Sequence, residues 1–271
     1  MNSDEDPEDI LSSSLLTLYE YHPITLSSAG SIFTYHSPDQ SIPTVTLCTP
    51  DTQAANWSLH ASSVWAASRF LADHIDYLHL PTHHSRCPPG KRVKLLELGA
   101  AAGLPSIVIA KRYPEVSVTV SDYPDVDLIR TLTENVVKNG VSANCRAVPY
   151  GWGSDPSTLY LPDDTEKFDI VIAADTLWNP EFHGLFIDTL RLTLKKSSDS
   201  RIHLFAGLHT GRYTIQSFLN AVSTAGFDLE TALEKETNGE RQRLWSVDRP
   251  EGEDESERRR WIVCLSLRWK Q

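Results

Sequence analysis

The chain has 271 residues, 40% of them apolar, and no run approaches the ~20 consecutive apolar residues of a membrane-spanning helix. Its formal net charge of −11 disfavours nucleic acid as a partner and favours a basic one, although acidity alone would also keep the protein soluble. Four scattered cysteines without a C-x-x-C pair argue against a zinc site or a disulfide framework and predict a reducing, cytoplasmic location.

The first ninety residues are expected to precede the regular part of the fold. Residues 1–29 are acidic and then rich in serine, lack the basic stretch of a signal or transit peptide, and are expected to be flexible. Residues 31–35 and 44–48 alternate apolar and polar side chains around a turn, which predicts a β-hairpin. Apolar residues near helical spacing predict an amphipathic helix over residues 60–78, and residues 81–90 are expected to form a loop.

Strands and helices then alternate to the end of the chain. The predicted strands cover residues 93–98, 116–121, 146–149, 168–173, 202–206, 227–233 and 261–269. The predicted helices begin after Gly103 and near Val126, and cover residues 181–194 and 215–225. The charge run at residues 251–260 is expected to be a solvated hairpin loop.

This alternation predicts a mostly parallel α/β sheet with helices on both faces. One domain is expected over residues 30–271. It would consist of a hairpin and helix extension at 30–90 and a ligand-binding core at 91–271.

The stretch from Leu95 to Gly103 (LLELGAAAG) is typical of a buried strand that breaks into a glycine-rich turn and opens a helix. The next strand ends on Asp122, and such strand ends form nucleoside sites in open α/β sheets. A dinucleotide site would use G-x-G-x-x-G, whereas this turn is G-A-A-A-G, and Glu97 ahead of it would repel a phosphate. The pattern therefore favours a cationic ligand without phosphate, such as S-adenosylmethionine.

Asp122 is a candidate for binding ribose, because a carboxylate at a strand end can accept two hydrogen bonds from its hydroxyls. The alternative is a cap for the following helix, for which Asp125 is better placed. For Gly99 and Gly103, a tight turn without a ligand is the alternative.

Residues 97–104 (ELGAAAGL) resemble the E-L-G-x-G-x-G-L motif of the seven-β-strand protein methyltransferases. The blocks VWAA at 64–67, YGWG at 150–153 and FDIVIAAD at 168–175 extend the resemblance to the branch that methylates lysines of translation factors and chaperones. The GAAAGLP form and the segment from Asn179 to His183 are most similar to fungal enzymes that methylate the N-terminal amine and the adjacent lysine of elongation factor 1-alpha. The resemblance covers roughly residues 30–270.

The resemblance implies a Rossmann-like, seven-stranded class I methyltransferase sheet whose last strand is antiparallel. It also implies S-adenosylmethionine as cofactor and S-adenosylhomocysteine as product. The implied cofactor contacts are Trp65, Glu97, Gly99, Ala100, Ala101, Gly103, Asp122, Trp152 and Ala174. For Trp65 and Trp152, packing in the core is the alternative to a cofactor contact.

Asp175 begins D-T-L-W, which is similar to the D-x-x-Y motif of the family with Trp178 in place of tyrosine. The carboxylate would hold an incoming ammonium group beside the cofactor, and the indole would supply a cation–π wall without the hydroxyl of tyrosine. Capping of the next helix is the alternative for Asp175.

Three further polar residues, Asn179, His183 and His209, are candidates for substrate contacts, although surface polarity explains them equally well. His83, His84 and Cys87 resemble metal ligands only superficially, and no metal is predicted.

These features together predict an S-adenosylmethionine-dependent protein N-methyltransferase in which a neutral amine attacks the methyl carbon in line. The resemblance implies elongation factor 1-alpha as the substrate. A lysine-only protein methyltransferase, a methyltransferase of small amines such as nicotinamide, and a non-catalytic cofactor-binding scaffold are the alternatives.

Overall fold

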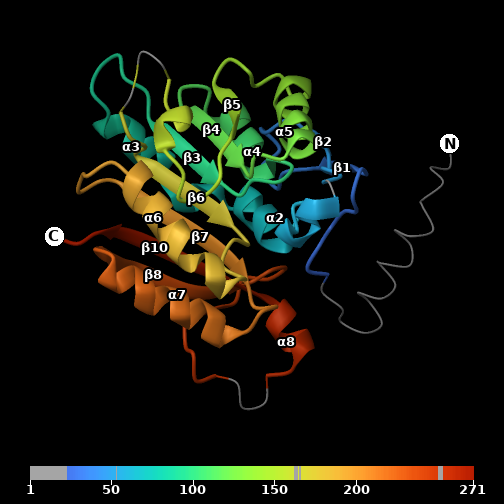
Figure 1. Ribbon diagram of the computed structural model, residues 1–271, viewed down its shortest axis with the longest axis vertical. Helices are drawn as coiled ribbons and strands as arrows, with labels where there is room; N and C mark the ends of the chain where they lie inside the picture. The colour runs from blue at the N-terminus through green and yellow to red at the C-terminus, as the bar shows by residue number, and fades with distance from the viewer. Residues whose placement is uncertain (1–22, 53, 162–163, 165, 250–252) are drawn as a thin grey trace.

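The structure is a computed structural model that describes residues 23–52, 54–161, 164, 166–249 and 253–271 (Figure 1). Eight strands form its central sheet: β3 (Lys94–Leu98), β4 (Ser117–Asp122), β5 (Cys145–Pro149), β6 (Ile170–Ala174), β7 (Arg201–Gly207), β8 (Phe227–Glu236), β9 (Gln242–Leu244) and β10 (Trp261–Trp269). Their order in the sheet is β5-β4-β3-β6-β7-β10-β8-β9.

The first five strands of that order pair in parallel, and β10 runs antiparallel between β7 and β8. The mostly parallel sheet and its antiparallel last strand are therefore confirmed. The sheet has one strand more than the seven expected, because β9 pairs antiparallel with β8 at the edge.

Helices cover both faces of this sheet. One face packs against α2 (Ala66–Asp73), α4 (Leu104–Arg112) and α5 (Val126–Lys138). The other packs against α6 (His183–Thr193) and α7 (Arg212–Thr224), which lie side by side in Figure 1. Strand β6 shows why both faces can be covered: Ile170 and Ile172 enter the core on the α4 side, while Val171 and Ala173 enter it on the α6 side.

The N-terminal hairpin is confirmed as β1 (Ile32–Tyr35) paired antiparallel with β2 (Val45–Cys48). Residues 1–22 of the segment expected to be flexible lie outside the described residues. The described part of that segment is held by backbone hydrogen bonds from the Leu26 N–H to the Val64 carbonyl and from the Ala66 N–H to the Ile24 carbonyl. The flexibility of the segment and the predicted division at residues 29 and 90 stay predictions.

The predicted helix over residues 60–78 is shorter than expected, since α2 is followed by a separate 3₁₀ helix at Ile75–Leu78. The loop expected at 81–90 was wrong for its first half, which forms α3 (Leu80–Arg86). His79 joins the two helices in a left-handed conformation with φ 47°. Pro81 lies in the first turn of α3, where its missing N–H costs little.

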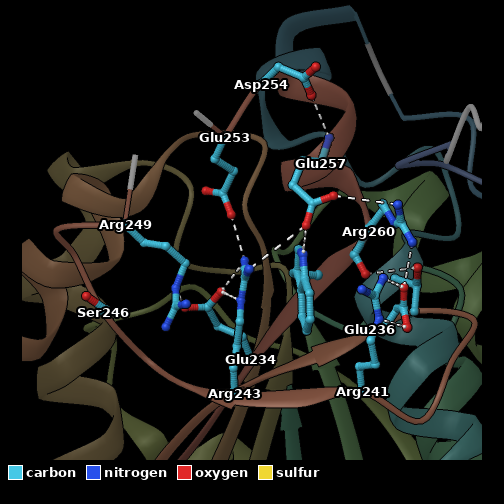
Figure 2. A network of polar contacts seen from close by, with 12 residues as sticks. Glu234, Glu236, Arg241, Arg243, Ser246, Arg249, Glu253, Asp254, Glu257 and Arg260 are labelled. Atoms are coloured by element: carbon cyan, nitrogen blue, oxygen red, sulfur yellow. Dashed lines mark hydrogen bonds and ion pairs between the residues drawn. The ribbon is translucent and has the colours of Figure 1, made fainter. Parts of the chain in front are cut away.

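The charge run near the C-terminus was also interpreted wrongly as a solvated loop. Residues Glu255–Arg259 form α8, and the Glu253 side chain is only 5% exposed. Arg212, at the start of α7, pairs with both Glu234 of β8 and Glu253. Arg243 of β9 reaches the same two carboxylates, so a buried ion network ties this segment to the sheet (Figure 2).

Three further 3₁₀ helices, at Ala54–Leu59, Pro156–Leu159 and Pro180–Phe182, complete the described elements. Within the ranges that the structure describes, no helix has the length and apolarity for crossing a bilayer. The same ranges contain no group of three or more side chains placed to hold a metal ion.

Candidate active site

A cavity of about 380 Å³ opens beyond the carboxyl ends of β3, β4 and β6. Eight of the residues predicted from the sequence line it: Trp65, Gly99, Ala101, Asp122, Trp152, Ala174, Asp175 and Trp178. A smaller hollow of about 20 Å³ shares part of this wall and is also lined by Glu97, Ala100 and Gly103. The fold therefore brings eleven predicted residues to one end of the sheet, where open α/β sheets bind their ligands.

The glycine-rich turn passes directly under the cavity. Gly99 has a left-handed backbone with φ 69°, and a Cβ at this position would lie 2.9 Å from Cγ2 of Thr176. A side chain there would therefore clash with the loop after β6. The N–H of Ala101 donates to Oδ2 of Asp122 at 2.6 Å, so the turn after β3 is tied to the end of β4.

Asp122 is 8% exposed, and both of its carboxylate oxygens accept backbone hydrogen bonds, from Ala101 and from Tyr123 (2.6 Å each). Burial raises the pKa of Asp122 to about 6. A carboxylate has about four lone-pair sites, so two stay available on the side of the cavity. Asp125 caps α5 by accepting from the N–H groups of Asp127 and Leu128, which removes helix capping as the role of Asp122.

Glu97 lies under the turn beside the smaller hollow. It is 1% exposed, and its Oε2 accepts a hydrogen bond from the Ser106 N–H at 3.1 Å. Burial raises the pKa of this carboxyl group to about 7. A cationic ligand group in the hollow would favour the ionised form, since an opposite charge offsets the cost of burial.

The two tryptophans that were predicted to contact the cofactor line the cavity and also pack against neighbouring rings. Trp152 packs against Phe186 with ring centroids 4.7 Å apart, and a Cβ at Gly99 would lie 3.4 Å from its ring. Trp65 donates its indole N–H to the His60 carbonyl at 2.9 Å and stacks on His209, with ring centroids 5.2 Å apart. Core packing and a ligand contact are therefore compatible for both side chains.

Asp175 follows β6 in a left-handed conformation with φ 54°. Its Oδ1 accepts from the Gly207 N–H at 2.7 Å, and its Oδ2 accepts from the Ala67 N–H at 3.3 Å. Burial raises the pKa of Asp175, opposed by the charge of His209 and by these two N–H groups. Helix capping of the segment belongs to Asn179, whose Oδ1 accepts from the Glu181 N–H, so that alternative for Asp175 is wrong.

Backbone strain is concentrated at this cavity. The described residues include four non-glycine positions with positive φ, and three of them, His60, Ala101 and Asp175, line it. Strained conformations persist where the surrounding structure enforces them, and they cluster at functional sites.

Three neighbouring aromatic rings line the same cavity as Asp175. Trp178 meets His60 edge-on with ring centroids 5.0 Å apart, and His60 meets Trp65 edge-on at 6.2 Å. The sequence analysis did not single out His60, although it lies just before the VWAA block that carries Trp65. It also missed Tyr123, a cavity residue that directly follows Asp122.

Two of the three predicted substrate contacts lie near the cavity without lining it. His209 packs behind Trp65, and Asn179 caps the 3₁₀ helix at Pro180–Phe182. The prediction for His183 is corrected by its position in the core. That ring is 5% exposed, lies 3.0 Å from the Leu177 carbonyl through Nε2, and packs edge-on against Phe218.

Asp122→Ala is expected to weaken the binding of S-adenosylhomocysteine by about 10- to 100-fold, because it removes a charged acceptor of hydrogen bonds. The affinity of the wild-type protein is expected to fall as the pH drops through about 6, because the Asp122 carboxylate becomes protonated near its raised pKa. Calorimetry measures both effects. The matched control is Asp127→Ala, which removes a nearby acid in the first turn of α5 that does not line the cavity. Equal affinities of the two variants for S-adenosylhomocysteine would show that Asp122 does not belong to the binding site.

Glu97→Gln is expected to stabilise the ligand-free protein at pH 8 and to do so much less, by about 1 kcal/mol, at pH 5. Because the folded-state pKa of about 7 lies above the ordinary value of 4.5, wild-type stability is expected to fall as the pH rises through this window. The gain at pH 8 is about 3 kcal/mol, from 1.36 kcal/mol per pKa unit. Urea denaturation at both pH values measures it, and an equal gain at pH 5 would contradict the assignment.

Comparisons with known proteins identify the family of the chain. A family model described as lysine methyltransferase matches residues 52–225. The chain is 30% identical over 224 residues to a protein N-terminal and lysine N-methyltransferase of Emericella nidulans, covering 78% of this chain and 81% of that protein. A protein of the same name from Gibberella zeae is 30% identical over 253 residues, covering 85% and 83%. Among solved structures, the chain is similar to the fibrillarin pre-rRNA processing protein of Methanococcus jannaschii (TM-score 0.47, 12% identity, coverage 92% and 97%).

The residues of the cavity also fit the methyl donor of such enzymes. With the donor bound, the carboxylate of Asp122 would accept hydrogen bonds from ribose hydroxyls and the indole of Trp152 would offer a face for adenine. The positive charge of the donor would favour the ionised form of Glu97, whose pKa is raised to about 7. The family model covers more than half of the chain. The chain therefore belongs to the lysine methyltransferase family and takes its methyl group from S-adenosylmethionine.

Proposed function

We propose that the protein methylates the N-terminal amine and the adjacent lysine of elongation factor 1-alpha in the cytoplasm. The observation that supports the proposal is the lining of one cavity, in which Asp175 lies together with Trp178 and Trp65. The names of the relatives, protein N-terminal and lysine N-methyltransferases, support protein amines as substrates. Elongation factor 1-alpha follows from the similarity of the GAAAGLP turn and the segment from Asn179 to His183 to the fungal enzymes that modify it.

The cavity suits an amine that approaches as a cation and reacts as a neutral base. The Asp175 carboxylate attracts an ammonium group, and Trp178 and Trp65 add aromatic faces that favour a cation. An α-amino group has a pKa of about 8, against about 10.4 for lysine, so it loses its proton more readily near neutral pH. Positioning the neutral amine in line with the sulfonium methyl group is then the main contribution of the chain.

The remaining cavity residues would hold the cofactor, which supplies an electrophilic methyl group when bound. We assign ribose binding to Asp122 and adenine contact to Trp152. Further contacts with the cofactor are assigned to residues of the turn and of β6, and to two neighbouring side chains. These residues are Gly99, Ala100, Ala101, Gly103, Ala174, Glu97 and Trp65. Asn179 at the edge of the cavity would contact the substrate, and His209 would position Trp65 from behind.

Transfer of tritiated methyl groups to an extract from a strain that lacks this protein tests the proposal, with mass spectrometry of the labelled band. Label on the N-terminal peptide of elongation factor 1-alpha is the expected result. Label restricted to internal lysines would favour a lysine-only enzyme, and a substrate peptide with a blocked N-terminus checks this. No labelled protein, with S-adenosylhomocysteine still bound, would overturn the proposal in favour of a small-molecule enzyme or a scaffold.

A further inference from the structure

A second cavity, of about 530 Å³, lies over strands β7, β10 and β8 and shares no residue with the first. Its other side is lined by Tyr77 of the 3₁₀ helix at Ile75–Leu78, by His83 of α3, and by His79 between the two helices. His79 is the fourth non-glycine residue with positive φ among the described residues, the other three being at the cofactor cavity. The proposed methyltransferase function makes no use of this second cavity.

The two ends of the second cavity differ in charge. At one end, Arg201 forms a fork with Glu230 (2.7 and 3.1 Å), and Arg86 pairs with Asp199 at 2.6 Å. Each guanidinium group at this end therefore has its own carboxylate, and the local charge is balanced. At the other end, the half-buried ammonium of Lys235 contacts the Tyr77 hydroxyl and lies 4.0 Å from the centre of that ring. No carboxylate of the described residues pairs with Lys235.

His203 provides an uncompensated polar atom at the balanced end. The residue is 7% exposed, and its Nε2 has no hydrogen-bond partner among the described residues. Burial lowers the pKa of His203 to about 3, with the charges of His83, His79 and Arg201 adding to the effect, so the ring is neutral. A buried polar atom without a partner is costly, and a hydroxyl group can satisfy either tautomer of the ring because it both donates and accepts.

An apolar floor separates these two ends. Phe205 of β7, Cys264 of β10 and Leu233 of β8 lie at one level of the sheet, since Cys264 pairs with both of the others. Lys235 follows Leu233 by two residues, and His203 precedes Phe205 by two. Each end is therefore about 6–7 Å from the floor along the strands, at ~3.3 Å per residue.

We propose that this second cavity binds a small organic acid that carries a hydroxyl group at its far end. The carboxylate pairs with Lys235, the apolar body covers Phe205 and Cys264, and the hydroxyl bonds to Nε2 of His203. A single lysine suits a monoanion, because the arginines at the other end already have partners. The chain as a whole has a net charge of −11 and would repel an anion. The attraction of an anion to this cavity would therefore come from the Lys235 ammonium group alone.

The test uses the full chain saturated with S-adenosylhomocysteine and three probes of one size: 4-hydroxyphenylacetate, phenylacetate and tyramine. Nitrogen-15 NMR of the histidine rings reports on His203 during titration. The expected result is saturable binding of 4-hydroxyphenylacetate, about 10-fold weaker binding of phenylacetate, and no binding of tyramine, whose cation would face Lys235. Absence of a saturable shift at His203 at millimolar 4-hydroxyphenylacetate, or equal binding of tyramine, would overturn the proposal.

Two variants locate the bound acid. Lys235→Met is expected to weaken binding of 4-hydroxyphenylacetate about 10-fold or more. Lys196→Met, which removes a lysine over the Trp269 ring outside the cavity, is expected to have no effect. His203→Leu should abolish the preference for 4-hydroxyphenylacetate over phenylacetate while phenylacetate still binds. Methyl transfer by each variant shows that the fold is intact, and equal losses in the two lysine variants would contradict the assignment.

Discussion

Asp175→Asn is expected to reduce methyl transfer by about 100- to 1000-fold, the usual cost of removing one preorganised electrostatic group from an active site. The substitution removes the negative charge that attracts the amine. Asparagine tolerates the left-handed backbone of this position, and its carbonyl can still accept one of the two N–H groups now bound by Asp175. The loss therefore reports on charge rather than on misfolding.

Two measurements separate this role of Asp175 from a structural one. The affinity for S-adenosylhomocysteine is expected to stay within about three-fold of the wild-type value, because the charge acts on the amine and not on the product. Asp188→Asn removes an acid from the exposed side of α6 and serves as the matched control. Methyl transfer by Asp175→Asn at the rate of this control would refute the proposed role.

Arg212→Met is expected to lower the free energy of unfolding by about 3–5 kcal/mol, the usual cost of breaking a buried ion pair. The Arg212 side chain is 3% exposed and forms forks with Glu234 (2.7 and 2.8 Å) and Glu253 (2.9 and 2.8 Å). Glu234 is 0% exposed, so it would keep its charge in the interior with Arg243 and the more distant Arg249 as its remaining partners (Figure 2). Urea denaturation measures the loss.

Arg191→Met is the control for this experiment. Arg191 pairs with Asp188 at the surface, where the two side chains are 54% and 60% exposed, and such pairs contribute about 0–1 kcal/mol. The double variant Arg212→Met/Glu234→Met is expected to recover part of the lost stability, because it removes the stranded carboxylate as well. A cost for Arg212→Met no larger than that for Arg191→Met would show that the network contributes nothing.

The position of the network connects it to the active site. Arg212 begins α7, four residues after Leu208, and Gly207 immediately before that leucine donates its N–H to Asp175. The network therefore anchors the chain five residues after the backbone N–H that holds the Asp175 carboxylate.

Local pattern predicted most of the residues that line the cavity at the carboxyl ends of β3 and β4. The strand ending in Leu98, the turn at Gly99 and the strand ending in Asp122 are consecutive in the chain, and their spacing alone places them together at one sheet edge. The capping role of Asp125 followed from the same kind of short-range rule and is confirmed.

Long-range packing decided what the pattern could not. In the sequence, His183 and His60 look alike as polar residues at the start of a predicted helix. His183 is enclosed by Leu177 and Phe218, whereas His60 lines the cavity beside Trp178. Glu253 belongs to a charge run that predicts a solvated loop, and its burial depends on Arg212, 41 positions away, and on Arg243, which both pair with it. Periodicity and turn chemistry act over a few residues, so they determine strands, caps and turns. Burial and charge pairing depend on partners that only the folded chain brings together.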